Sequence, residues 1–322
     1  MENVENVEII KSASLWKDAW KRLLKNKLAV FGLIVMALMT IAVIIGPAIV
    51  QWATGFTYDF IPSKVGNGEL VKSFPPSFQH PMGTDDQGRD ILARVLQGGR
   101  ISLMVGVIST IVSLIIGVSY GATAGYLGDR IDNFMMRIVD IIYSIPYLLI
   151  VIVLLSAFGG QNTPAWIKSI SELFGGQGLS QIFLLFFALG MISWLTMARV
   201  VRGQILSLKN QEFVMAARAT GVSTPGIIFR HLVPNALGPI IVYATLTVPS
   251  VMLSEAFLSF LGLGVQPPYA SWGSLAAEGI KNIAIYPWQL IFPGVTMALT
   301  LFSLNFLGDG LRDALDPQTR KF

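Results

Sequence analysis

The residues best suited to bind a cation are three neighbouring carboxylates, Asp85, Asp86 and Asp90. Carboxylate oxygens are ligands that Ca²⁺ prefers, but calcium loops place such residues at alternating positions. That alternation is absent around Asp85. We therefore expect the three carboxylates to cap a helix and to pair with Arg89 or Arg94, and we predict no metal site.

Other residue types that carry chemistry are scarce. The sequence has no cysteine, which excludes disulfides, thiolate catalysis and cysteine–metal sites. Its two histidines, His80 and His231, lie far apart, so we expect no histidine metal centre. The phosphate-binding pattern G-x-x-x-x-G-K-[ST] does not occur. We predict no catalytic residue and no cofactor bound by this chain.

Glu255 is the acidic residue in the most unusual position. It is the only charged residue between Arg230 and Glu278, and it lies inside a long apolar run. A carboxylate within a bilayer is costly unless it faces a partner or water. Two interpretations stay open: Glu255 lines a pathway and meets a cationic group, or it makes an interhelical hydrogen bond.

Residues 205–236 form a charged stretch between two long apolar runs. Residues 212–220 are rich in good helix formers, and Gly221 suits the left-handed conformation that ends a helix. The small side chains of Ala216 and Ala217 would let a groove on another protein approach closely. We interpret this helix as a docking element; the alternative is a surface hairpin without a partner.

A second short helix is predicted after Gly221. Thr224 followed by Pro225 is typical of an N-cap and a first helical position. Pro234 is predicted to end this helix. A structureless connection of about six residues would suffice to join two membrane helices. The sequence therefore predicts a helix-turn-helix that does more than connect spans.

The composition indicates an integral membrane protein. Of the 322 residues, 53% are hydrophobic and 13% are charged, and the mean hydropathy is +0.63. Soluble domains have about a quarter of their residues charged. The net charge of +4 and the isoelectric point near 9.3 are attributed to orientation in the lipid bilayer, and no nucleic-acid partner is expected.

Six segments are apolar and long enough to cross a bilayer core, which takes about 20 residues. The first is too long for the core of a signal peptide, so we predict that it is retained. The chain is therefore predicted to be an all-α integral membrane protein with both termini on one side. The predicted spans are 28–50, then 101–122, 138–158, 182–201, 237–261 and 288–307 within a core of residues 101–307.

Lys and Arg residues set the predicted orientation, because cytoplasmic loops carry an excess of them. Sixteen of the 23 lie in regions 1–27, 123–137, 199–236 and 308–322, and the other seven lie in 51–100, 159–181 and 262–287. The termini and the loop 205–236 are therefore predicted to be cytoplasmic. Segment 1–27 is expected to be amphipathic and interfacial, and 308–322 to be a tail.

The extracytoplasmic segment 51–100 is expected to contain a helix. Thr84 and Gln87 match a capping box, and an apolar stripe follows at helical spacing. We expect this helix to lie on the outer membrane surface, separate from the span that begins at residue 101. The stripe consists of Ile91, Leu92, Val95 and Leu96.

Small residues and prolines inside the spans predict close packing and bends. Gly117, Gly121 and Gly125 recur every four residues, a spacing that lets helix backbones approach closely. Asp140 is expected to cap a helix or to pair with Arg137. The prolines that fall within spans, interpreted as kinks or as hinges for opening and closing, are Pro146, Pro249 and Pro293.

The loop 205–236 resembles the coupling loop of ABC importer permeases, whose pattern is E-A-A-x3-G-x9-I-x-L-P. Alanine, glycine and proline match in spacing, whereas Met215, His231 and Val233 stand where the pattern has Glu, Ile and Leu. Glu212 supplies a carboxylate one turn before Met215. The residues that the resemblance assigns to contact with an ATPase are Glu212, Met215, Ala216, Ala217, Gly221 and Pro234.

Four more segments resemble, in order, the dipeptide, oligopeptide and nickel branch of these permeases. They read HPMGTDDQGRDILARVLQGGRISL, AGYLGDRIDNFMMRIVDIIYSIP, LSEAFLSFLGLGVQPPYASWGSLAAEG and NFLGDGLRDALDPQ. The similarity is greatest to the subunit with a long outer segment before the second span. Five ordered segments are far more specific than one motif.

The resemblance implies a type I importer permease in the cell membrane of a prokaryote, paired with a second homologous permease. It implies a non-catalytic chain driven by two cytoplasmic ATPases, which bind ATP and Mg²⁺, and supplied by an extracytoplasmic binding protein. The implied substrate is a dipeptide or oligopeptide. Nickel is an alternative, which the scarcity of His and Cys disfavours. A secondary transporter driven by an ion gradient is another, and only Glu255 fits it.

Overall fold

The computed structural model describes residues 15–61, 72–173 and 179–315. Within these ranges the backbone is helical apart from turns, loops and one isolated β-bridge between Thr84 and Asp90. The elements are α1 (Leu15–Leu23), α2 (Lys27–Thr54), α3 (Ile91–Leu127), α4 (Asp129–Ser144), α5 (Tyr147–Phe158), η1 (Gly160–Asn162), α6 (Ala165–Leu173), α7 (Leu179–Leu208), α8 (Glu212–Ala219), α9 (Thr224–Gly226), η2 (Ile227–Leu232), α10 (Val233–Asn235), α11 (Leu237–Phe260), α12 (Trp272–Gly279), η3 (Ile280–Asn282) and α13 (Trp288–Leu315).

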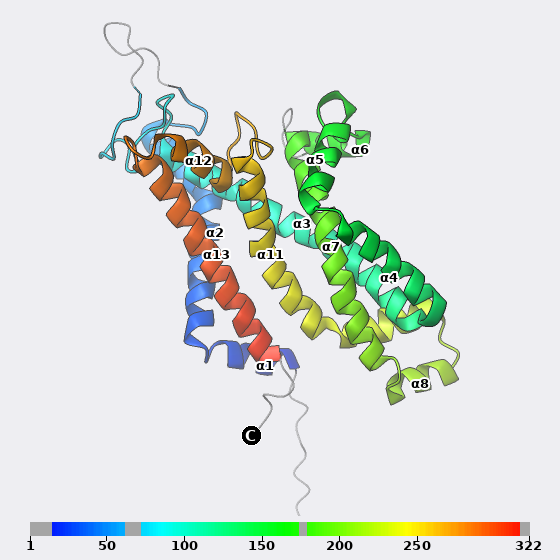
Figure 1. The fold of residues 1–322 in the computed structure, drawn as a ribbon. Helices are drawn as coiled ribbons and strands as arrows, with labels where there is room; N and C mark the ends of the chain where they lie inside the picture. Colours follow the sequence, from blue (N-terminus) through cyan, green and yellow to red (C-terminus); the bar gives the residue numbers. More distant parts are fainter. Residues whose placement is uncertain (1–14, 62–71, 174–178, 316–322) are drawn as a thin grey trace, which may run out of the picture.

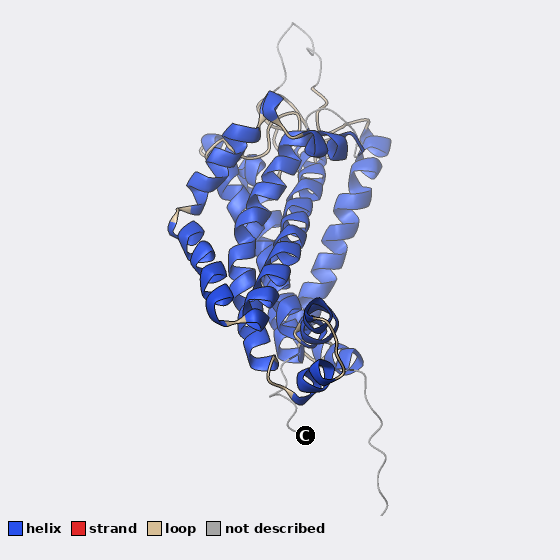
Figure 2. Cartoon of the chain, turned by 90° about the vertical axis from the view of Figure 1, so that its right-hand side faces the viewer, coloured by secondary structure: helices blue, strands red, loops and turns tan. Residues whose placement is uncertain are grey.

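The long helices run side by side between two ends of the molecule (Figure 2). Figure 1 shows α12 at one end and α1 and α8 at the other, and we name these the α12 end and the α8 end. Five helices are long and apolar enough to cross a membrane, or six if α4 and α5 form one broken span. Parts of the predicted segments 1–27, 51–100 and 308–322 lie outside the described residues.

The centre of the bundle is the contact between α3 and α7, the most extensive helix pair in the described structure. A Cβ atom added to Gly121 of α3 would collide with the carbonyl oxygen of Ala198, and one added to Gly117 would lie 2.6 Å from the Met197 side chain. Gly125 approaches the same helix near Arg202. The predicted packing role of these glycines is confirmed.

The helix α2 packs against α13, and α1 packs on the last turns of α13. Asn26 caps α2 because its side-chain oxygen accepts hydrogen bonds from the N–H groups of Leu28 and Ala29, at 3.1 and 3.3 Å. Only 17% of the most apolar stretch of α2 is buried inside the chain. The outward face of α2 is therefore suited to lipid or to another membrane helix.

Pro47 interrupts the hydrogen bonding of α2, and Arg100 of α3 compensates. Proline has no N–H to donate to the carbonyl four residues earlier, which here belongs to Val43. The Arg100 Nε donates to this oxygen at 2.6 Å, and its Nη2 donates to the carbonyl of Ile44. Carbonyls freed within a bilayer require such a partner. Arg100 therefore fastens α2 to α3 at the level of the proline.

Replacing Arg100 with leucine is expected to destabilise the folded protein by about 1–3 kcal/mol, because two carbonyls lose a charged donor. Adding Pro47→Ala to that variant should recover part of the loss, since the Val43 carbonyl regains a helical N–H. Thermal unfolding of the purified protein measures both changes. Equal melting temperatures for the single and the double variant would contradict this role of Arg100.

The predicted third span, 138–158, is broken at Pro146 rather than kinked. The axes of α4 and α5 meet there at 86°. Proline cannot donate a backbone hydrogen bond, and it keeps the preceding residue, Ile145, in extended conformation with ψ 129°. By contrast, α11 and α13 continue through Pro249 and Pro293.

The prediction of a separate surface helix before the second span, with a capping box at Thr84 and Gln87, is wrong. The helix begins after Asp90 and continues as α3 without a break. The Thr84 hydroxyl instead accepts a hydrogen bond from the Phe74 N–H at 2.6 Å. Ile91 and Val95 of the predicted apolar stripe are buried in a cluster with Trp272 of α12, so this part of α3 packs inside the protein.

Candidate functional site

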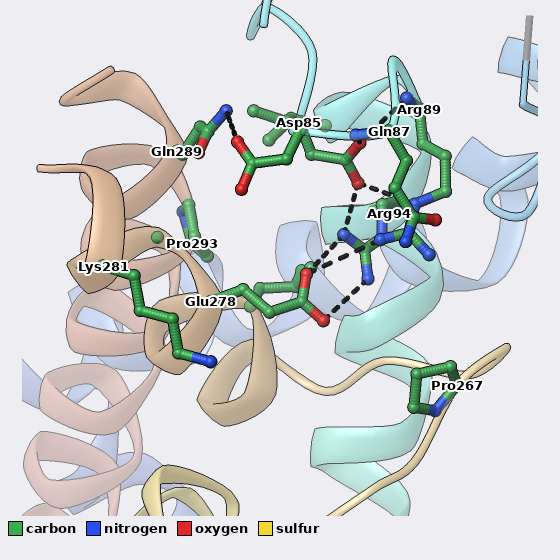
Figure 3. A pocket seen from close by; sticks show the side chains of 13 residues that line it. Asp85, Gln87, Arg89, Arg94, Pro267, Glu278, Lys281, Gln289 and Pro293 are labelled. Atoms are coloured by element: carbon green, nitrogen blue, oxygen red, sulfur yellow. Dashed lines mark hydrogen bonds and ion pairs between the residues drawn. The ribbon is translucent and has the colours of Figure 1, made fainter. Parts of the chain in front are cut away.

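Charged side chains cluster at the α12 end, between α3, α12 and the loop before α3 (Figure 3). Asp85 accepts hydrogen bonds from Arg89 Nε at 2.7 Å and from Arg94 Nη1 at 2.6 Å. Arg94 also donates to Glu278 at 2.7 Å. Asp90 caps α3 by accepting a backbone N–H at 2.8 Å. The predicted pairing of Asp85 and capping of a helix are confirmed.

Asp85, Arg89, Arg94 and Glu278 line a cavity of about 300 Å³. Asp86 accepts hydrogen bonds from Asn282 at 2.6 Å and from Gln289 of α13 at 3.2 Å. The cluster therefore joins the loop before α3 to both α12 and α13. Across the described residues, no group of three or more His, Cys, Asp or Glu residues is placed to hold a metal ion.

Glu255 lies in α11 with 1% of its surface exposed. It accepts hydrogen bonds from the hydroxyls of Ser259 and Ser271, at 2.6 and 2.7 Å. Ser271 is the N-cap of α12, so the carboxyl group joins α11 to α12. These contacts favour the interpretation that Glu255 makes an interhelical hydrogen bond. Glu255 does not line either of the two cavities described in this section.

Glu255→Gln is expected to leave stability and uptake close to wild type, because the amide oxygen accepts the same two hydroxyl hydrogen bonds. Glu255→Ala leaves two buried hydroxyls without their acceptor and should cost about 1–3 kcal/mol. Melting temperatures of the two variants compare these effects. A loss in the Gln variant as large as in the Ala variant would show that the carboxylate charge itself is required.

The helix α8 projects from the bundle at the α8 end (Figure 1). Val214 and Ala217 are buried, with 0% and 6% of their surfaces exposed. Glu212, Met215 and Ala216 are exposed. The face open to a partner thus holds Glu212, Met215 and Ala216, whereas Ala217 packs on the bundle.

Gly221 follows α8 with φ +77°, the left-handed conformation predicted for it. The next helical stretch begins with Ser223 as N-cap and Thr224 as first helical residue, one position earlier than predicted. Pro234 does not end this stretch: a π-helical segment over Ile227–Leu232 is followed by α10, which contains Pro234, and α11 begins after Ala236. Pro234 stands in the first turn of α10, where a missing backbone N–H is tolerated.

Side-chain contacts tie α8 to the long helices. The Arg218 guanidinium lies 5.1 Å from the centre of the Tyr126 ring, in the last turn of α3, and its Nε donates to the Tyr126 hydroxyl at 3.1 Å. Val214 and Ala217 belong to a buried cluster with Ile205 of α7. The helix α8 is therefore in contact with both α3 and α7.

A cavity of about 540 Å³ lies where α4 and α5 meet, beside α7 and α11. All its polar side chains carry hydroxyl groups and none is charged, and we call it the hydroxyl cavity. The sequence did not predict it, because its walls come from segments far apart in the chain and depend on the break at Pro146. The lining residues are Ile142, Tyr143, Ile145, Pro146, Tyr147, Ile150, Ile192, Ser193, Leu195, Thr196, Tyr243, Leu246, Thr247, Ser250 and Ser254.

Two ion pairs connect α4 to α7. Asp140 accepts a hydrogen bond from Arg199 Nη2 at 2.7 Å, so the predicted pairing with Arg137 is wrong. The packing of α4 on α7 leaves Arg137 on the exposed face. Asp132 accepts two hydrogen bonds from Arg202, at 2.5 and 2.6 Å.

The described structure is thus a helical bundle with five or six candidate membrane spans, an uncharged cavity among them and a projecting helix at one end, the architecture of a multi-pass membrane protein. The chain belongs to the family of binding-protein-dependent transport system inner membrane components, whose model matches residues 113–321. Residues 14–62 match the N-terminal transmembrane domain of oligopeptide transport permease C.

Relatives of similar length support this membership. The chain is 46% identical over 322 residues to the oligopeptide transport system permease protein OppC of Escherichia coli strain K12, covering 99% of this chain and 97% of the relative. It is 44% identical to OppC of Bacillus subtilis strain 168, covering 97% and 92%. The dipeptide transport system permease protein DppC of B. subtilis is 43% identical, covering 96% and 88%.

Among solved structures, the methionine ABC transporter MetNI in inward-facing conformations is similar with a TM-score of 0.49. The sequence identity is 17%, and the match covers 69% of this chain and 96% of the MetNI chain. Family membership itself confirms the predicted ABC importer permease and its multi-pass location in a bacterial cell membrane. It decides against a secondary transporter driven by an ion gradient.

Proposed function

We propose that this chain is the transmembrane subunit of an ATP-driven importer of dipeptides and oligopeptides. The observation that carries the proposal is its 43–46% identity, over nearly the whole chain, to permeases named for oligopeptide and dipeptide transport. The hydroxyl cavity supports it, since hydroxyl groups both donate to and accept from peptide groups. Nickel would favour imidazole or sulfur ligands, which that cavity lacks.

The proposed assembly contains a second, homologous permease, two ATPase subunits and an extracytoplasmic peptide-binding protein. This chain performs no catalysis, and ATP and Mg²⁺ bind to the ATPases. The distribution of Lys and Arg supports a cytoplasmic location for the α8 end. In that orientation Glu212, Met215 and Ala216 face the ATPases, and Gly221 and Pro234 shape the loop that presents them.

The proposed mechanism is alternating access by population shift. ATP binding closes the ATPases, and α8 moves with the groove that holds it. The Arg218–Tyr126 contact and the buried cluster behind Val214 pass this motion to α3 and α7. ATP favours one arrangement only if it binds that arrangement more tightly than the other. The break between α4 and α5 supplies a hinge beside the hydroxyl cavity.

Purification of the affinity-tagged chain from its own cells tests the assembly. A second permease and ATPase subunits are expected to co-purify in comparable amounts. Uptake by those cells of a labelled tripeptide and of labelled nickel tests the substrate. Deletion of the gene for this chain should abolish peptide uptake and leave nickel uptake unchanged; the opposite pattern would contradict the proposal.

A further inference from the structure

The hydroxyl cavity has a charged border towards the α8 end. Asp140 lies three residues before Tyr143 of the lining, and Arg199 lies three residues after Thr196, so each is about one helical turn beyond the cavity. The Arg199 guanidinium lies 4.4 Å from the centre of the Tyr143 ring. A solute leaving the cavity in this direction meets these two charges first.

The Asp140–Arg199 ion pair is weakly held, so a charged ligand can displace one of its partners. Its side chains are 65% and 40% exposed, and one hydrogen bond of 2.7 Å joins them. An exposed, single ion pair contributes little to stability because water screens it. A ligand charge can therefore replace either partner at low cost.

The neighbouring pair provides the structural attachment of α4 to α7. Asp132 and Arg202 share two hydrogen bonds, and the Asp132 side chain is only 9% exposed. The Asp140–Arg199 pair is therefore not required to attach α4 to α7. The guanidinium N–H groups and the carboxylate oxygen that do not take part in its single hydrogen bond point to a function in ligand recognition.

We propose that Asp140 and Arg199 form a binding site for the charged ends of a peptide that leaves the hydroxyl cavity. Peptides differ in their side chains but share a free α-amino group and a free α-carboxylate. A guanidinium binds a carboxylate through parallel N–H groups, so Arg199 takes the carboxyl end of a peptide that leaves with that end first, and Asp140 takes the ammonium end of one that leaves in the opposite direction. The two groups are in contact, too close together to hold both ends of one extended peptide at once. This site rests on the proposed function. It would let a pathway whose cavity is uncharged recognise any peptide that has a free α-amino or a free α-carboxylate group.

Uptake of blocked and free peptides tests the site in proteoliposomes that hold the complete transporter. The probes are trialanine, its C-terminal amide and its N-acetyl derivative. In Arg199→Gln, the preference for the free over the amidated peptide should fall about fivefold, while the preference over the acetylated peptide stays as in wild type. Asp140→Asn should give the reverse pattern. The same binding protein is present throughout, so its own preference cancels in the comparison with wild type.

Arg137→Gln is the matched control, because Arg137 is exposed on the same helix without contacting the cavity. It should keep both wild-type preferences. Arg199→Lys retains the positive charge and should keep most of the preference for the free carboxylate. The two main variants test the two halves of the site separately, so either suffices if the other does not assemble.

Unchanged preferences in both variants, or equal loss of both preferences in each, would overturn the site while leaving the importer intact. If the wild-type transporter shows ATP-dependent uptake of none of the three peptides, this result would instead contradict the proposed function.

Discussion

Gly121→Leu is expected to prevent formation of the folded permease. The added side chain would meet the Ala198 carbonyl of α7, a backbone atom that cannot move unless α3 and α7 separate. Overpacking by a few methylenes already costs about 1–3 kcal/mol. Here the clash falls in the most extensive helix contact of the described structure, between two further glycines that require the same close approach. The expected loss therefore exceeds the usual range for a single substitution.

Size-exclusion chromatography of a fluorescently tagged chain measures this effect. The Gly121 variant should elute as aggregate or be absent from the membrane fraction. Gly203→Leu is the matched control, since Gly203 lies on α7 but an added Cβ meets nothing within 4 Å. A monodisperse Gly121→Leu protein with wild-type melting temperature would contradict the α3–α7 packing.

Gly221→Val is expected to uncouple ATP hydrolysis from uptake. Gly221 has φ +77° and no atom within 4 Å of an added Cβ, so the cost is backbone strain alone, about 1–2 kcal/mol. Relief of that strain changes the turn that directs α8 away from the bundle. The bundle itself is untouched, so the membrane pair should assemble and ATP hydrolysis should persist while uptake falls about tenfold or more.

Gly262→Val provides the control for Gly221→Val. Gly262 has φ +79° and the same open surroundings, but it follows α11 at the opposite end from α8. Both variants carry similar strain, and only the Gly221 variant should raise the number of ATP molecules hydrolysed per peptide transported. Wild-type coupling in Gly221→Val would remove the coupling role proposed for α8.

Features that depend on nearby residues were predictable from the sequence. The left-handed conformation of Gly221, which ends α8, depends only on that residue and the helix before it. The close packing of α3 at Gly117, Gly121 and Gly125 is signalled by glycines that recur every four residues. The family followed from five motifs in order. Hydrophobic length predicted α2, α7, α11 and α13, although helix bounds extend beyond the apolar core because polar ends continue the same helix.

Features that depend on distant partners were not predictable. Asp140 has Arg137 three residues away, and only the packing of α4 on α7 selects Arg199 instead. Arg100 acquires its role from a proline on another helix at the same level. For the same reason the hydroxyl cavity has no signature in the sequence: Pro146 signals a bend, but the helices that meet around the bend come from separate parts of the chain.

ATP-driven accumulation of peptide in proteoliposomes tests most directly whether this chain is an importer permease. The vesicles contain this chain, its partner permease and the ATPases, with the binding protein and a labelled oligopeptide added on the side opposite α8. We expect accumulation that requires both ATP and the binding protein. Accumulation without ATP, driven by a proton or sodium gradient, would contradict the proposed function.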